Sequence, residues 1–142
     1  MRPVASARMF LLAALLAPCA APAQPSPGTA SAPADGRTLF ARNCAACHQA
    51  DGRGIPGAFP ALAGSSVVVG APAEAAEVLL KGRGGMPDFS ASLDDAEIAG
   101  VLTYTRGSWG NRAAPVTEAE IAARRSALQV GPATRSRFGN KH

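Results

Sequence analysis

The fold of this chain is decided by residues 43–49, Asn-Cys-Ala-Ala-Cys-His-Gln (NCAACHQ), in which two residues separate two cysteines and a histidine follows the second cysteine. A cysteine pair at this spacing occurs in disulfides, in zinc sites, in thiol redox motifs and in covalent haem anchors. The choice among them depends on the compartment of the protein and on the other ligands that the chain offers.

The amino-terminal 23 residues have the pattern of a secretory signal peptide. Arg2 and Arg8 form a positive region, residues 9–16 are apolar, and Ala21-Pro22-Ala23 is a small-residue cleavage signal. The apolar run is much shorter than the ~20 residues that cross a bilayer. We therefore expect residues 1–23 to be cleaved near Ala23 and the mature protein to be periplasmic.

Cys19 lies shortly after the apolar run, where a bacterial lipoprotein carries its lipidated cysteine. Lipoprotein signals usually place a small residue before that cysteine, and Pro18 occupies this position. Lipidation of Cys19 stays open as a minor route to the membrane.

Cleavage leaves few side chains that can bind a metal. After residue 23 the chain holds two cysteines (Cys44 and Cys47), two histidines (His48 and His142) and one methionine (Met86). This scarcity restricts the possible ligand sets.

The charge is divided unevenly along the mature chain. Residues 24–120 hold seven Lys/Arg against ten Asp/Glu, and five basic residues with no acidic residue follow Glu120. No basic patch is interleaved with aromatic residues, so we expect no nucleic-acid partner. The basic end is a candidate for docking an acidic partner or an anionic membrane surface, but we favour a solvated, disordered tail.

Local composition predicts the first part of the mature chain. Residues 24–34 are rich in Pro, Ser, Ala and Gly, which predicts a flexible leader. Asp35 is a suitable N-cap for a helix that runs toward Cys47. Residues 49–69 contain recurrent glycines and prolines, which predict an ordered loop.

Three further helices are expected: Pro72–Lys81, one that begins after Asp94 and ends around residues 107–110, and one that begins after Thr117. The first has proline in its first turn and a glycine after its end. The other two begin with capping boxes, Asp94 with Glu97 and Thr117 with Glu120. No segment alternates apolar and polar residues as a strand would, so the predicted fold class is all-α.

Among the chemistries of the cysteine pair, the residues favour covalent haem attachment. A structural zinc site needs four ligands and would have to recruit carboxylates. A thioredoxin-like pair needs an α/β context, and a plain disulfide gives no role to His48. In C-x-x-C-H each thiol adds to one haem vinyl group and the histidine binds the iron. We therefore predict one covalent haem c per chain, bound by Cys44, Cys47 and His48.

The second axial ligand should be Met86, which lies 38 residues after His48. A lone methionine usually fills a gap in a core. This one lies in a Gly-Gly-Met-Pro loop, where the glycines permit close backbone approach and Pro87 biases Met86 toward extended backbone. Lys81 or His142 would be the alternative ligand.

Histidine and methionine ligation indicates electron transfer. Thioether sulfur favours iron(II), and a six-coordinate iron has no open site for oxygen or peroxide. We expect a protein that is not an enzyme and that cycles its haem between iron(II) and iron(III). A haem enzyme, or a gas or redox sensor with a labile sixth ligand, is the alternative.

Residues 35–110 resemble a class I cytochrome c beyond the C-A-A-C-H and G-G-M-P motifs. Gly36 and Phe40 match the G-x-x-x-F of the family's first helix, and Leu102 and Tyr104 match the last helix, which crosses it. The resemblance implies three to five short helices wrapped around one haem, with a glycine at the crossing and aromatic residues sealing it.

Residues 59–64 (FPALAG) are similar to the family segment G-P-x-L-x-G, with Phe59 in place of the glycine. Pro60 lies 12 residues after His48, which is the family's spacing. The resemblance implies that the Pro60 carbonyl accepts the imidazole N–H and that Leu62 packs on the haem. Pro56 is a weaker candidate for that carbonyl.

Residues 102–111 (LTYTRGSWGN) resemble the haem-c subunits of periplasmic dehydrogenases and small diffusible cytochromes of that subgroup. This implies a dehydrogenase as electron donor and an oxidase or another cytochrome of the respiratory chain as acceptor. Residues 111–130 are then expected to be a C-terminal helical extension, and residues 131–142 a basic disordered tail.

Overall fold

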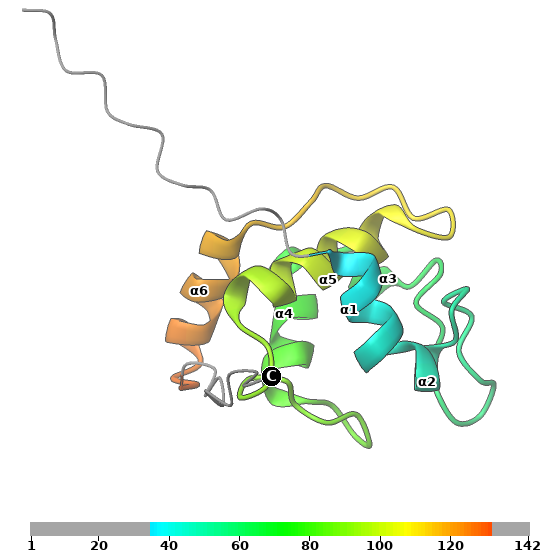
Figure 1. Cartoon of the computed structure of the whole chain (residues 1–142), viewed down its shortest axis with the longest axis horizontal. Helices are drawn as coiled ribbons and strands as arrows, with labels where there is room; N and C mark the ends of the chain where they lie inside the picture. The colour runs from blue at the N-terminus through cyan, green and yellow to red at the C-terminus, as the bar shows by residue number, and fades with distance from the viewer. Residues whose placement is uncertain (1–34, 132–142) are drawn as a thin grey trace, which may run out of the picture.

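The computed structural model describes residues 35–131, which form six α-helices (Figure 1). No strand occurs in this range, which confirms the all-α fold class. The helices outnumber the expected three to five because two of them are single turns. The predicted signal peptide, the leader and the tail from residue 132 lie outside the described residues. None of the helices between residues 35 and 131 combines the length and apolarity needed to cross a membrane.

α1 (Gly36–Asn43) begins at Asp35 as predicted, because the Asp35 carboxylate accepts the backbone N–H groups of Arg37 and Thr38. The helix is interrupted at Cys44, where φ is −124° and ψ is −35°. It resumes as the single turn α2 (Ala45–His48). The helix that runs toward Cys47 is thus divided in two, at a position with no glycine or proline to signal a break.

The loop predicted for residues 49–69 ends early, because α3 (Ser66–Val69) is a helical turn. Its consecutive valines are weak helix formers. The turn forms because Val68 is buried and α3 packs on α4 and α5. α4 (Pro72–Lys81) has the predicted bounds and ends where Gly82 adopts a φ of 72°.

α5 (Asp95–Gly107) and α6 (Glu118–Ala127) both begin with the predicted capping boxes. The Asp94 carboxylate accepts the N–H of Glu97 at 2.8 Å, and the Thr117 hydroxyl accepts the N–H of Glu120 at 3.3 Å. Each glutamate in turn accepts the backbone N–H of its N-cap residue. The starts of these helices are therefore fixed by local sequence.

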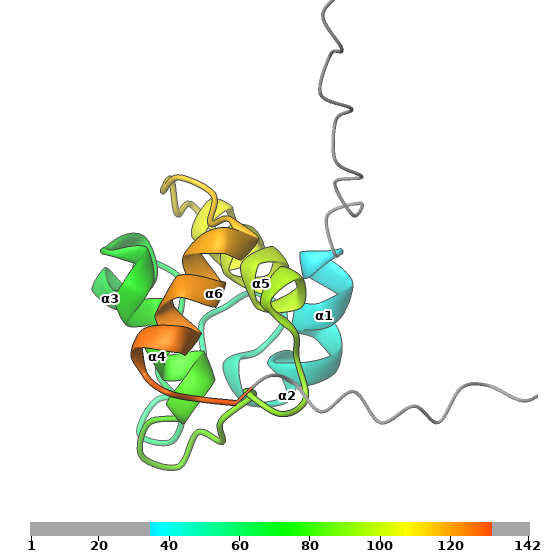
Figure 2. The same cartoon turned by 90° about the vertical axis from the view of Figure 1, so that its left-hand side faces the viewer.

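α1 and α5 pack against one another (Figure 2), and Gly36 of α1 faces Gly100 of α5. A Cβ atom on Gly36 would lie 2.0 Å from the carbonyl oxygen of Gly100, so only glycine permits this approach. Aromatic rings cover the crossing, with the Phe40 ring centroid 5.5 Å from that of Tyr104 and 5.0 Å from that of Trp109. This contact packs α1, which leads into the cysteine segment, against α5.

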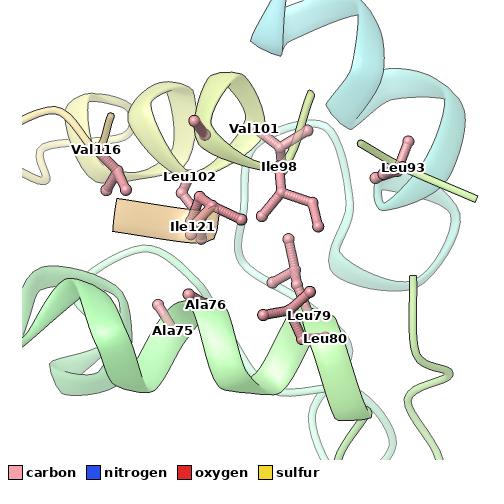
Figure 3. Packing of buried hydrophobic residues seen from close by; sticks show 11 residues of the cluster. Ala75, Ala76, Leu79, Leu80, Leu93, Ile98, Val101, Leu102, Val116 and Ile121 are labelled. Atoms are coloured by element: carbon pink, nitrogen blue, oxygen red, sulfur yellow. The ribbon is translucent and has the colours of Figure 1, made fainter. Parts of the chain in front are cut away.

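The hydrophobic core lies among α4, α5 and α6 (Figure 3). Side chains of α4 and α5 point toward one another, and Ile121 of α6 lies between them. Each fully buried Leu or Ile stabilises the fold by roughly 1.5–3 kcal/mol. Because Val116 and Ile121 belong to the same cluster as Leu102, residues beyond 110 share the core of the preceding helices.

Candidate functional site

A cavity of about 370 Å³ is bounded by the helices α1 to α5 and by the loops that follow α2 and α4. In Figure 1 the loop after α4 lies below the helices and extends toward the side of the molecule where α2 lies. The cavity lining is mostly apolar, as in sites that hold a small organic ligand. The six residues that sequence analysis favoured for the site all line this cavity: Cys44, Cys47, His48, Pro60, Leu62 and Met86.

His48 is 7% exposed, and its Nδ1 atom lies 2.9 Å from the carbonyl oxygen of Pro60. A carbonyl oxygen can only accept, so Nδ1 carries the proton and donates it. The other ring nitrogen, Nε2, then keeps a lone pair that can bind a metal. The hydrogen bond that the resemblance implied is present, and its acceptor is Pro60 rather than Pro56.

Gly54 determines where the Pro60 carbonyl lies. Its N–H donates to the His48 carbonyl at 2.9 Å. At a φ of 65°, a Cβ atom on Gly54 would lie 2.4 Å from the Phe59 oxygen and 2.6 Å from the Pro60 oxygen. Ile55 and Phe59 exchange two backbone hydrogen bonds of 2.8 Å, which fold the loop back on itself. The glycine therefore permits the return of the chain over His48.

Asn111, which sequence analysis did not identify, fixes the same loop from beyond the end of α5. It is 5% exposed, and its Oδ1 accepts the N–H of Gly64 at 2.8 Å. Its Nδ2 donates to the carbonyls of Leu62 at 3.1 Å and Thr105 at 2.8 Å. Asn111 thus joins α5 to the segment that follows Pro60.

Trp109 supports the start of this loop. Its indole Nε1 donates to the Ala50 carbonyl at 3.1 Å, and a Cβ atom on Gly52 would lie 2.4 Å from its ring. The Gly52 carbonyl accepts the N–H groups of Leu62 at 2.7 Å and Ala63 at 3.0 Å. The loop that carries Pro60 is therefore connected at both ends to residues that follow α5.

Cys44 and Cys47 are half-buried free thiols that line the cavity. Burial raises the pKa of the Cys44 thiol to about 11, and the neighbouring Cys47 adds to the shift. Cys44 is therefore a neutral thiol at pH 7.

Met86 is half-buried and faces the cavity from the loop after α4. Arg83 and Met86 exchange backbone hydrogen bonds of 3.2 and 3.1 Å, which close a tight turn. Gly82 permits this turn, because at its φ of 72° a Cβ atom would lie 2.6 Å from the Met86 carbonyl oxygen. The N–H of Phe89 donates to the Leu79 carbonyl at 2.7 Å and ties the loop to α4.

The alternative ligands named from the sequence have other positions. Lys81 is exposed, pairs with Glu77 at 3.7 Å and is not among the residues that line the cavity. His142 lies outside the described residues.

The fold and the cavity define a class of protein. A helical domain has C-x-x-C-H on the wall of an apolar cavity, a proximal histidine oriented by a proline carbonyl, and a methionine loop on the same cavity. This donor set, of two thiols, one imidazole and one thioether, is that of a c-type cytochrome.

Comparison with known proteins gives the family. The family model described as "Cytochrome C oxidase, cbb3-type, subunit III" matches residues 31–104, more than half of the chain. The chain therefore belongs to this family of c-type cytochromes, and the resemblance to a class I cytochrome c is confirmed. Membership implies a covalently attached haem c.

Three relatives illustrate the range of the family. The cytochrome c subunit of alcohol dehydrogenase (quinone) from Gluconacetobacter polyoxogenes is 38% identical over 109 residues, which cover 68% of this chain and 23% of the relative. Cytochrome c-552 from Thermus thermophilus is 39% identical over 94 residues, which cover 55% of this chain and 70% of the relative. The gluconate 2-dehydrogenase cytochrome c subunit from Pantoea cypripedii is 32% identical over 104 residues, which cover 63% of this chain and 24% of the relative. The chain thus spans about a quarter of the length of the two dehydrogenase subunits.

Proposed function

We propose that this chain is a periplasmic electron carrier or electron-transfer subunit that cycles one haem c between iron(II) and iron(III). Cys44 and Cys47 would anchor the haem, and His48 and Met86 would bind its iron. The observation that carries the proposal is the convergence of these four side chains on one apolar cavity. The protein would transfer electrons and would not itself be an enzyme.

The residues around the cavity fit a haem c. Two thiols are available for two thioether bonds, and the Nδ1 hydrogen bond of His48 leaves Nε2 for the iron. The apolar walls suit a flat macrocycle. Arg83 is the one arginine or lysine in the lining, and its guanidinium, which also pairs with Glu74 at 3.4 Å, would balance a carboxylate of the haem. When bound, the haem supplies an iron that gains and loses one electron.

The side chains of this protein would tune that electron transfer. The Pro60 carbonyl holds the His48 ring in one orientation and raises its basicity as a ligand. The Met86 thioether would favour the reduced state and raise the potential. Leu62 and the other apolar side chains of the lining would surround the haem with a medium of low polarity.

The partners that we propose follow from the relatives. Two relatives are subunits of dehydrogenases, so a periplasmic dehydrogenase is the proposed electron donor. An oxidase or another cytochrome of the respiratory chain is the proposed acceptor, since the family description names an oxidase subunit. The carrier would work either freely or inside such a complex.

The test is the optical spectrum of the haem-loaded protein, oxidised and reduced, beside Met86→Ala and the control Lys81→Ala. We expect a covalently bound low-spin haem whose sulfur-to-iron charge-transfer band disappears in Met86→Ala and remains in Lys81→Ala. A redox titration should give one reversible one-electron couple.

Two results would contradict the proposal. A band that persists in Met86→Ala would remove Met86 from the ligand set. Rapid binding of carbon monoxide to the reduced native protein would indicate an open sixth position and would move the function toward catalysis or gas sensing.

A further inference from the structure

Arg125 of α6 is a buried cation whose partners all lie outside its own helix. It is 6% exposed, and its Nε donates to the Asp95 carboxylate at 2.7 Å. One terminal nitrogen donates to the carbonyls of Ser90 at 2.9 Å and Gly131 at 2.8 Å, and the other donates to the carbonyl of Leu93 at 3.1 Å. One side chain therefore binds three positions between residues 90 and 95.

These positions form the end of the loop that carries Met86. The segment runs from Gly82, at the end of α4, to Asp95, the first residue of α5. Its beginning is closed by the Arg83–Met86 turn, and its middle is tied to α4 through Phe89. The side chain of Arg125 connects its last part, from Ser90 to Asp95, to α6, beside the buried Leu93.

The hydrogen bonds of Arg125 are worth more than surface contacts because the bond to Leu93 is buried and the other three are partly buried. Loss of the guanidinium would leave the carbonyls of Ser90 and Leu93 and the carboxylate of Asp95 without this donor. An unpaired buried acceptor is most easily resolvated by moving the loop outward. α6 itself keeps its other anchors, which are the buried Ile121 and the contact between Arg124 and Glu77 of α4.

We propose that Arg125 is a positioning residue for Met86. It holds the end of the Met86 loop against the core and thereby slows the departure of the methionine from the iron. α6 lies beyond the residues that the family model matches, so this chain would hold its sixth ligand with a segment that the model does not describe. The inference rests on the proposed role of Met86 as that ligand.

The test compares three variants of the haem-loaded, oxidised protein: Arg125→Gln, Arg125→Lys and the control Ile121→Val. Ile121→Val weakens the same helix through its apolar contacts and leaves the loop hydrogen bonds in place. Imidazole is added, and the loss of the sulfur-to-iron charge-transfer band is followed over time. Unfolding by denaturant is measured for each variant, so that changes in exchange rate are compared with changes in stability.

We expect Arg125→Gln to lose the band about tenfold faster than the native protein, because the loop opens when buried hydrogen bonds are removed. Arg125→Lys keeps a positive charge near Asp95, so its rate of band loss should lie between those of Arg125→Gln and the native protein. Ile121→Val should lose the band at the native rate. Equal rates in Arg125→Gln and the native protein would overturn the proposal, as would equal acceleration in Ile121→Val. A native protein without the band would overturn the ligand assignment itself, and the proposal with it.

Discussion

The loop beside His48 and the loop beside Met86 face the same cavity but are held in different ways. The His48 side is fixed by a buried asparagine, by a glycine packed against a tryptophan ring, and by a proline carbonyl bonded to the ligand itself. The Met86 side is a turn that is tied to α4 by the backbone N–H groups of Gly82 and Phe89, to α6 by the guanidinium of Arg125, and to the core by partly buried side chains. We infer that the His48 side resists perturbation and that the Met86 side is the one that can exchange.

The largest effect is expected from Gly54→Ala, which should displace the loop beside His48. The new Cβ atom would collide with the carbonyls of Phe59 and Pro60, and the residue would keep a strained φ. We expect a loss of about 3 kcal/mol in the free energy of unfolding. Less covalent haem should form, because the Pro60 carbonyl is displaced from His48. Denaturant unfolding and haem staining of the denatured protein would measure both.

Gly57→Ala is the matched control for that substitution. Gly57 has a φ of 80°, and a Cβ atom there would meet nothing within 4 Å. Its substitution should cost only about 1 kcal/mol of backbone strain and leave haem attachment unchanged. If both variants behaved alike, the close contact at Gly54 would not be what places Pro60.

Asn111→Ala should have the next largest effect. It removes the acceptor of the Gly64 N–H and the amide donor of the Leu62 and Thr105 carbonyls, which keep only the longer bonds from Ser65 at 3.3 Å and Ser108 at 3.4 Å. We expect a loss of about 2 kcal/mol in unfolding free energy. The reduction potential should shift while the Met86 charge-transfer band remains, because the change acts on the His48 side.

Asn43→Ala removes the same side chain at an exposed position, where its Nδ2 bonds only within α1. Its free energy of unfolding should stay within about 0.5 kcal/mol of that of the native protein. Loss of the Met86 charge-transfer band in Asn111→Ala would show that the two sides of the cavity are coupled and that the Met86 side does not move independently of the His48 side.

Gly82→Ala tests the Met86 side. The new Cβ atom would lie 2.6 Å from the Met86 carbonyl, but the surrounding turn is exposed and can shift. We expect a loss of about 1.5 kcal/mol in unfolding free energy and a clear weakening of the charge-transfer band. Gly84→Ala, at a φ of 59° with no neighbour within 4 Å, should keep the band. An intact band in Gly82→Ala would mean that the turn does not set the position of Met86.

The smallest effect concerns pH and the haem-free protein. Burial raises the pKa of the Cys44 thiol from 9.0 to about 11. Between these pH values the folded chain keeps a proton on Cys44 that the unfolded chain has lost. The contribution of the neutral Cys44 thiol to the free energy of unfolding is therefore complete below pH 9 and is lost as pH rises toward 11. Thermal unfolding of the apoprotein at several pH values should show the decrease, and Cys44→Ala should remove it. The same slope in Cys44→Ala would assign the effect to another group.

Sequence patterns predicted the helices well where the signals are local. Proline and glycine mark the ends of α4, and the capping boxes at Asp94 and Thr117 mark the starts of α5 and α6. These signals act within three or four residues, so they survive without knowledge of the fold. α3 was missed because its valines form a turn only when Val68 is buried against α4 and α5.

The candidate site was predictable for a different reason. Few cysteines, histidines and methionines remain after residue 23, so the ligand types could be assigned by elimination. The residues that support the ligands could not. Asn111 and Arg125 are polar side chains in segments that look solvent-exposed in sequence, and most of their partners lie 30 to 49 residues earlier in the chain.

The sequence by itself determined the class of fold, the four capped or proline-initiated helices and the kinds of atom that face the cavity, because each depends on neighbouring residues or on scarcity. Only the tertiary structure decided which carbonyl orients His48, how closely Gly36 meets Gly100, and which buried amide and guanidinium hold the two loops. These contacts join residues far apart in the chain. Their strength comes from burial, which exists only once the helices have packed.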